Sequence, residues 1–106
     1  MSPKVHSLAY PLKNETAAFR IIDNEAVILN LNNGIYYSLN EVGTKVWELC
    51  TGSNSLRDIT AAIVEEFEVQ DDIAQKDVSE IIIDLLKDGL VTISENQAEV
   101  KSDQKP

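Results

Sequence analysis

The hydrophobic pattern of this chain changes its period near residue 40. Before that point, apolar residues stand in short runs that turn dipeptides separate, with Phe19 and Ile21 in alternation in the first run, and after it they recur every three or four residues. A period of two is typical of strands, and a period near 3.6 is typical of helices. The pattern therefore predicts a β-sheet followed by helices, which is the α+β class.

Three strands are predicted, over Ala17–Ile22, Glu25–Leu31 and Ile35–Leu39. Asp23-Asn24 separates the first two strands, and Asn33-Gly34 precedes the third. Asn-Gly favours a type I′ turn, because both central residues of that turn need positive φ. Two-residue loops at both places would join the strands into an antiparallel β-meander.

This register divides the side chains of the meander between two faces. The face expected to pack on the core carries Phe19, Ile21, Ala26, Ile28, Tyr37 and Leu39. The other face, with Val27, Leu29, Leu31 and Tyr36, is too apolar to remain bare. Either a partner covers it, or the N-terminal segment does, through Leu8, Tyr10 and Leu12.

Three helices and a short closing strand are predicted after residue 39. The helix start signals are Asn40 as an N-cap, Ser55 with Asp58 as a capping box, and a third start between Asp72 and Gln75, and the stops are Gly52 and Gly89. Leu90–Ile93 is expected to be the closing strand. Trp47, in the first of these helices, is expected in the core, with its indole N–H reaching a partner at the edge.

The third helix has an apolar surface that widens to one side. Its buried stripe is predicted to be Val78, Ile81, Ile82, Leu85 and Leu86. Ile83 lies off this stripe, on the flank shared by Ser79, Ile82 and Leu86. A broad core face and a groove wall for a peptide both explain this arrangement, and the periodicity does not choose between them.

A single folded domain is expected over residues 17–93, since 106 residues suffice for one core. Residues 1–16 are polar and contain Pro3 and Pro11, so they are predicted to be a flexible N-terminal segment. Residues 94–106 are predicted to be a disordered C-terminal tail. No apolar run approaches the ~20 residues of a membrane span, and no secretory signal is present, so we expect a cytoplasmic protein without membrane contact.

The charge of the chain disfavours nucleic acid as a partner. Its formal net charge is −9, whereas affinity for phosphate backbones requires clustered Lys and Arg. Ten acidic residues stand against three basic ones between Arg57 and Asp88. This segment is either a solvated face or an acidic surface for a cationic partner.

Residues suited to catalysis are scarce. His6 is the one histidine, and Cys50 falls on the apolar stripe of the first predicted helix, where a buried thiol is expected. No group of residues has metal-ligand spacing, and no glycine-rich phosphate loop is present. We therefore expect no enzyme activity, no catalytic or metal site and no cofactor.

The third predicted strand is a candidate binding device. As the last strand of a meander, Gly34–Leu39 has a free edge with neither proline nor charge to protect it. An extended peptide could add to this edge and pack its side chains against the neighbouring helix. Tyr36, on the outer face, is the aromatic residue most suited to such a contact.

Several segments, in this order along the chain, carry a family resemblance. They are Ala26–Asn30, Gly34–Asn40, Gly43, Trp47–Leu49, Ser55-Leu56, Ile59, Phe67–Val69, Asp77-Val78 and Leu85–Val91. Together they resemble the PqqD-like family, also called RiPP recognition elements, across residues 17–93. The resemblance implies a winged-helix-like fold without catalytic residues, in which a three-stranded antiparallel meander packs on a three-helix bundle.

The resemblance also implies a function and a site. Members of this family bind the leader of a ribosomally synthesised precursor peptide by β-strand addition and present it to a modifying enzyme. That enzyme would be a radical SAM enzyme, or the leader peptidase and cyclase of a lasso-peptide system. The implied peptide-binding residues are Gly34, Ile35, Tyr36, Tyr37 and Ser38 on the strand and Val78, Ser79, Ile82, Ile83 and Leu86 on the third helix.

Two other classes of function remain open at this point. A winged-helix transcriptional regulator would insert the third helix into a DNA groove, but that helix presents Asp77, Glu80, Asp84 and Asp88 against Lys76 and Lys87. An adaptor domain that docks a folded partner is the other. It would bind that partner while extended peptides bind nowhere.

Overall fold

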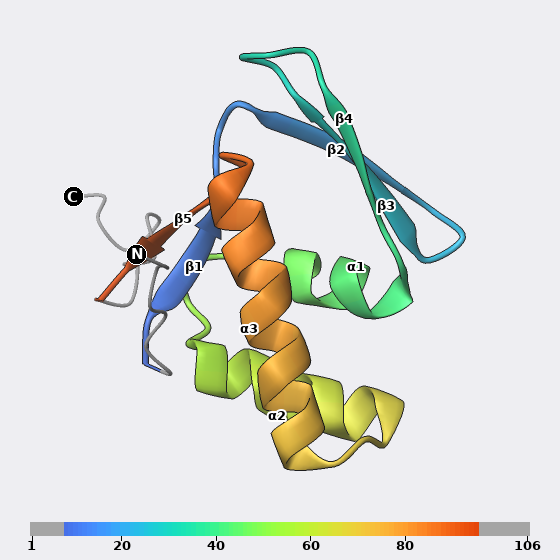
Figure 1. The fold of residues 1–106 in the computed structure, drawn as a ribbon, viewed down its shortest axis with the longest axis vertical. Coiled ribbons are helices and arrows are strands. Elements are labelled where there is room, and N and C mark those ends of the chain that lie inside the picture. The colour runs from blue at the N-terminus through green and yellow to red at the C-terminus, as the bar shows by residue number, and fades with distance from the viewer. Residues whose placement is uncertain (1–7, 96–106) are drawn as a thin grey trace, which may run out of the picture.

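The computed structural model describes residues 8–95 (Figure 1). The elements follow in the order β1 (Tyr10–Lys13), β2 (Ala17–Ile22), β3 (Glu25–Asn30), β4 (Tyr36–Leu39), α1 (Glu41–Glu48), α2 (Leu56–Phe67), α3 (Asp71–Lys87) and β5 (Val91–Ser94). β2, β3 and β4 form an antiparallel sheet in sequence order, and β1 pairs with β5 in a second sheet. The α+β class and the predicted three-stranded meander with three helices are confirmed.

The N-terminal part of the chain differs from its prediction. The prediction that folded structure begins at residue 17 is wrong, because Tyr10–Lys13 pairs antiparallel with β5. Pro11 is buried there, and its carbonyl accepts the Gly52 N–H, a role that needs no amide hydrogen from proline. Ser94, predicted to begin the disordered C-terminal tail, instead pairs with Tyr10 as the last residue of β5. Residues 1–7, predicted to be flexible, and residues 96–106, predicted to be disordered, lie outside the described residues.

The same pairing bears on the outer face of the three-stranded sheet. Tyr10 and Leu12 were predicted as one possible cover for that face, but both lie in β1, opposite Ser94 and Thr92 of β5. Figure 1 shows this second sheet on the far side of α3 from the β2–β3–β4 sheet. Covering of the outer face by these two residues is therefore ruled out.

The two turns of the meander have different geometries. Asp23 and Asn24, with φ of 52° and 66°, form the predicted two-residue turn between β2 and β3. Between β3 and β4 the loop is longer, since the Asn30 N–H donates to the Ile35 carbonyl at 2.9 Å. Gly34 has positive φ there and Asn33 does not, so the predicted type I′ turn is wrong.

The predicted division of faces is nevertheless confirmed. Ile28 pairs with Tyr37, and Ala26 pairs with Leu39, which is a shift of two residues from the register that a two-residue loop would impose. An even shift keeps every side chain on its own face, because side chains alternate with a period of two. Ala26 and Ile28 are fully buried, and Tyr37 and Leu39 pack against the core.

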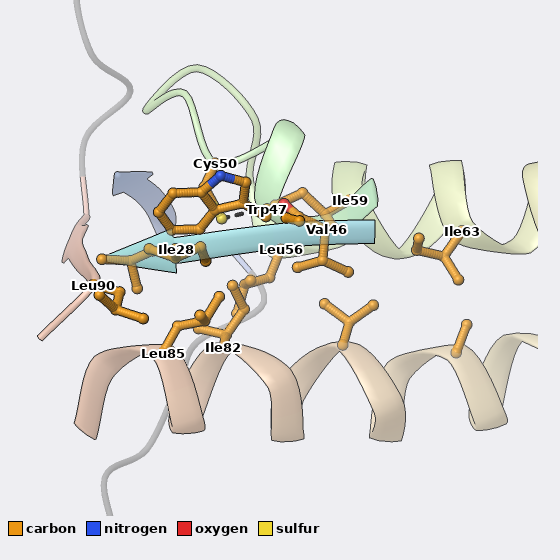
Figure 2. Packing of buried hydrophobic residues seen from close by; sticks show 14 residues of the cluster. Ile28, Val46, Trp47, Cys50, Leu56, Ile59, Ile63, Ile82, Leu85 and Leu90 are labelled. Carbon is orange, nitrogen blue, oxygen red and sulfur yellow. Dashed lines mark hydrogen bonds between the residues drawn. The ribbon is translucent and has the colours of Figure 1, made fainter. Parts of the chain in front are cut away.

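The core joins the sheet to all three helices (Figure 2). Ile28 from β3 and Trp47 from α1 lie over Ile82 and Leu85 of α3. α1 and α2 begin at capping residues: the Asn40 side chain accepts the Gly43 N–H, and Ser55 forms the predicted capping box with Asp58. α3 begins at Asp71, before the predicted start between Asp72 and Gln75, and Gln70 at its N-cap makes no side-chain cap hydrogen bond. α3 ends before Gly89, whose φ of 73° suits glycine.

Asn30 connects the β3–β4 loop to the end of α3. This side chain is buried, and its Nδ2 donates to the Asp88 carbonyl at 3.0 Å. Its Oδ1 accepts the N–H groups of Asn32 and Asn33 at 2.8 and 3.3 Å. One amide therefore shapes the loop that leads into β4 and fixes that loop against α3.

We expect Asn30→Ala to lower the free energy of unfolding by about 1 kcal/mol, because three hydrogen bonds lose their partner. Asn30→Asp keeps the two acceptor bonds but sets a carboxylate against the Asp88 carbonyl, so it is expected to destabilise as well. Asn32→Ala, at an exposed position of the same loop, is the control and should change stability by less than about 0.5 kcal/mol. Urea denaturation measures all three, and equal midpoints for Asn30→Ala and Asn32→Ala would contradict this role.

Candidate functional site

β4 leaves one edge of the three-stranded sheet unpaired. The Ile35 carbonyl points to β3, where it accepts the Asn30 N–H. Because backbone polar groups alternate along an antiparallel strand, those of Tyr37 and Leu39 also point to β3, and those of Tyr36 and Ser38 point outward. Among residues 8–95 no strand pairs with this outward edge. Two N–H and two C=O groups are thus directed at the space beside β4.

A cleft of about 430 Å³ lies next to this edge. Its residues come from the end of β4 and the start of α1 on one side and from α3 on the other: Ser38, Leu39, Asn40, Val42 and Gly43 face Asp77, Glu80, Ile81 and Asp84. Leu39, Val42 and Ile81 are partly buried and pack against the core, so they supply the apolar part of the lining. A chain added to β4 would therefore lie beside α3.

Two residues of α1 hold the end of β4 in place. The Thr44 hydroxyl is buried, accepts the Ala26 N–H at 2.8 Å and donates to the Leu39 carbonyl at 3.3 Å. Gly43 allows the close approach, since an added Cβ would come within 3.3 Å of Leu39 Cβ and of Asn40 Oδ1. With Asn30 at its other end, the edge strand is fixed at both termini.

The α3 side of the cleft is acidic. Asp77, Glu80 and Asp84 follow one another at spacings of three and four residues, which places them on one face of the helix. All three carboxylates belong to exposed residues. The described residues that line the cleft include no lysine or arginine.

The predicted strand residues lie at this edge. Ile35 and Tyr36 are 50% and 67% exposed, and Tyr36 projects from the outer face of the sheet. Tyr37 lies on the inner face and packs against the core, and Ser38 lines the cleft. Gly34 leads into the strand from an exposed position. That these residues contact a peptide stays a prediction.

The predicted helix residues lie elsewhere. Val78 and Ile82 are fully buried in the core, and Leu86 packs against it. Ser79 lines a different hollow of about 520 Å³ between α2 and α3, and Ile83 is half-buried. None of the five lines the cleft beside β4.

Helix geometry explains this difference. At 100° per residue, the flank with Ser79, Ile83 and Leu86 lies on one side of the buried stripe, and the flank with Asp77 and Asp84 lies on the other. The packing of α3 turns the acidic flank toward β4. Sequence reasoning therefore missed Asp77, Glu80, Ile81 and Asp84 as cleft residues, although Ile81 stands at the border between stripe and flank.

Trp47 is a core residue, as predicted, but its indole N–H differs from expectation. The ring is fully buried and packs edge-to-face on Phe19, with centroids 5.3 Å apart. Lys13 Nζ lies 5.4 Å from the Trp47 centroid and donates to the Glu48 and Cys50 carbonyls at the end of α1. Among the described residues the indole N–H has no hydrogen-bond partner, so the predicted edge partner is wrong.

The cysteine of the chain lies in the core and not at the cleft. Cys50 is fully buried, as predicted, and its Sγ donates to the Val46 carbonyl at 3.3 Å. Within residues 8–95 no group of His, Cys, Asp and Glu side chains could hold a metal ion, and no helix is long and apolar enough to cross a membrane. His6 lies outside the described residues.

Burial raises the pKa of the Cys50 thiol from 9.0 to about 12, although nearby Lys13 acts in the opposite direction. The native protein should therefore resist thiol alkylation at pH 8 and react rapidly once unfolded in urea. Above pH 9 the unfolded chain releases this proton and the folded chain keeps it, so the stability that the thiol contributes is lost as pH rises toward 12. The stability of the wild type relative to Cys50→Ala, measured by urea denaturation, should therefore fall as pH rises above 9. Rapid alkylation of the native protein would contradict this picture.

Comparison with known proteins identifies the family. The family model of Coenzyme PQQ synthesis protein D (PqqD) matches residues 25–91. The chain belongs to the PqqD family. The matched residues include β3, β4 and all three helices, and therefore the whole of the cleft. No curated protein matches the chain.

Two solved structures resemble this member of the PqqD family. "TbiB1 in Complex with the TbiA(beta) Leader Peptide" has a TM-score of 0.70 and 26% sequence identity, and covers 83% of this chain and 99% of its own. "Lasso peptide synthetase B1 complexed with the leader peptide" has a TM-score of 0.70 and 19% identity, covers 78% of this chain and 98% of its own, and supports the fold. Both were solved with a leader peptide bound.

Proposed function

We propose that this chain binds the leader of a ribosomally synthesised precursor peptide as an additional strand on β4. The observation that carries this proposal is the outward-facing edge at Tyr36 and Ser38, which borders the cleft against α3. Such an edge supplies backbone hydrogen bonds to any extended chain, and the cleft supplies the side-chain contacts. Membership of the PqqD family and the likeness to TbiB1, solved with a leader peptide, support the proposal.

The protein then acts by presentation and not by catalysis. It holds the leader while a separate modifying enzyme, of the radical SAM type or the leader peptidase and cyclase of a lasso-peptide system, acts on the rest of the precursor. We place this activity in the cytoplasm, where ribosomal precursors are made. The burial of the Cys50 thiol in the core supports a non-catalytic role.

Each residue of the edge strand and the cleft has a role in this proposed peptide binding. The backbone of Tyr36 and Ser38 forms the hydrogen bonds, with Gly34, Ile35 and Tyr37 completing the strand. On α3, Ile81 replaces the predicted apolar residues as the contact, because it lines the cleft beside Leu39 and Val42. Ile83 and Ser79 remain contacts only if the peptide extends beyond this cleft.

A titration of the ¹⁵N-labelled protein with the leader of the precursor encoded beside its gene tests the proposal. Strand addition predicts shifts concentrated in residues 34–39 and on the cleft side of α3. A dispersed spectrum that no extended peptide changes would contradict it. Binding of a folded protein at that point would favour the adaptor function.

We expect Ser38→Pro to abolish peptide binding while the domain stays folded. Proline removes an N–H that points outward, so the guest strand loses a hydrogen bond while the β3–β4 ladder keeps its own. Ser38→Ala is the matched control, because it changes the same side chain and retains the N–H. Calorimetric titration with the leader measures affinity, and near-equal affinities for the two variants would contradict strand addition.

Ile81 and Ile83 give a second test of the site. Ile81→Ala should weaken leader binding several-fold, because a cleft residue loses about 1 kcal/mol or more of apolar contact. Ile83→Ala should change affinity less than twofold. If Ile83→Ala weakens leader binding more than Ile81→Ala does, the binding site lies on the flank of α3 that carries Ser79 and Leu86.

A further inference from the structure

The acidic flank of α3 bears on the kind of peptide that the cleft takes. We propose that the strand added to β4 is basic on the side that faces α3, where Lys or Arg stands two residues before and two residues after an apolar side chain. The proposal rests on the proposed function, because it assigns the chemistry of the peptide bound at that same edge.

The spacing of the cleft residues suggests this pattern. Ile81 follows Asp77 by four residues and precedes Asp84 by three, so carboxylates stand on both sides of the apolar contact along the helix. A rise of 1.5 Å per residue separates Asp77 from Asp84 by about 10 Å along the axis. Three successive inward positions of a strand span about 13 Å. A basic–apolar–basic set therefore matches the acid–isoleucine–acid set on α3.

Among residues 8–95, no basic side chain lines the cleft beside these carboxylates. The lysines of α3, Lys76 and Lys87, are not among the residues that line it. The other side of the guest strand would lie beside Tyr36, on the outer face of β4, and Tyr36 is not among the residues that line the cleft. The requirement for positive charge is thus confined to alternate positions of the peptide, and the net charge of −9 adds long-range attraction for a basic segment.

Short synthetic peptides test this pattern without knowledge of the natural leader. The first has the central sequence Lys-Thr-Ile-Thr-Lys, and the second has Glu in place of both Lys residues. A third has the composition of the first with its two Lys residues adjacent. Fluorescence anisotropy measures the affinity of each peptide for the full chain at about 0.01 M and about 1 M salt, where the Debye lengths are about 30 and 3 Å.

At low salt, we expect the alternating Lys peptide to bind about tenfold tighter than the Glu peptide, and tighter than the peptide with adjacent Lys. The preference should shrink at high salt. The variant Asp77→Asn/Glu80→Gln/Asp84→Asn should lose the preference for the alternating Lys peptide. The matched variant Glu65→Gln/Glu66→Gln/Glu95→Gln removes the same number of charges from exposed residues outside the cleft and should keep it.

Each other outcome overturns a stated part of the argument. Equal affinities of the Lys and Glu peptides, or failure of both to bind, overturn the inference. Equal loss of preference in the two triple variants overturns it too, since net charge alone would then explain the binding. Another outcome is that Ser38→Pro abolishes binding of the Lys peptide while Asp77→Asn/Glu80→Gln/Asp84→Asn still prefers the Lys peptide to the Glu peptide. In that case strand addition stands, and the acidic flank of α3 has no role in selecting the peptide. If Ser38→Pro binds as the wild type does, strand addition itself fails.

Discussion

Burial of one apolar face of α3 against Ile28 and Trp47 is the constraint on which the rest of the structure depends. Ile82 and Leu85 occupy the space below these two residues, and this contact sets both the position and the rotation of the helix. Once the buried stripe is placed, the flank that faces β4 is determined. The cleft, its apolar lining residues and the acidic flank of α3 beside it are consequences of how this core packs.

The edge strand depends on polar contacts for its position. A strand with one free edge has half of the hydrogen bonds of an inner strand, and it needs support from other elements. Asn30 supplies that support where the chain enters β4, and Thr44 supplies it where the chain leaves. An edge fixed in this way keeps its outward N–H and C=O groups in the geometry that an extended peptide needs, which lowers the entropic cost of binding.

The acidic flank of α3 also separates this chain from DNA-binding proteins of similar fold. A recognition helix approaches phosphates through basic residues, and the exposed carboxylates of Asp77, Glu80 and Asp84 would repel them. The same carboxylates face a cleft whose other wall offers backbone groups and apolar side chains. That combination suits a peptide better than a nucleic acid.

The sequence by itself determined the three strands and two faces of the meander, the presence of three helices, and the caps of α1 and α2. Local signals suffice for these features, because Asn40 and Ser55 cap their own helices and alternation assigns side chains to faces even when a loop changes the register by two. The β1–β5 pairing and the flank of α3 that lines the cleft were decided only by the tertiary structure. Both depend on partners distant in the chain: Pro11 pairs opposite Ile93, and Ile81 lies near Leu39 because of how Ile82 packs. Helical periodicity predicts a stripe with two flanks, but only packing decides which flank meets the sheet.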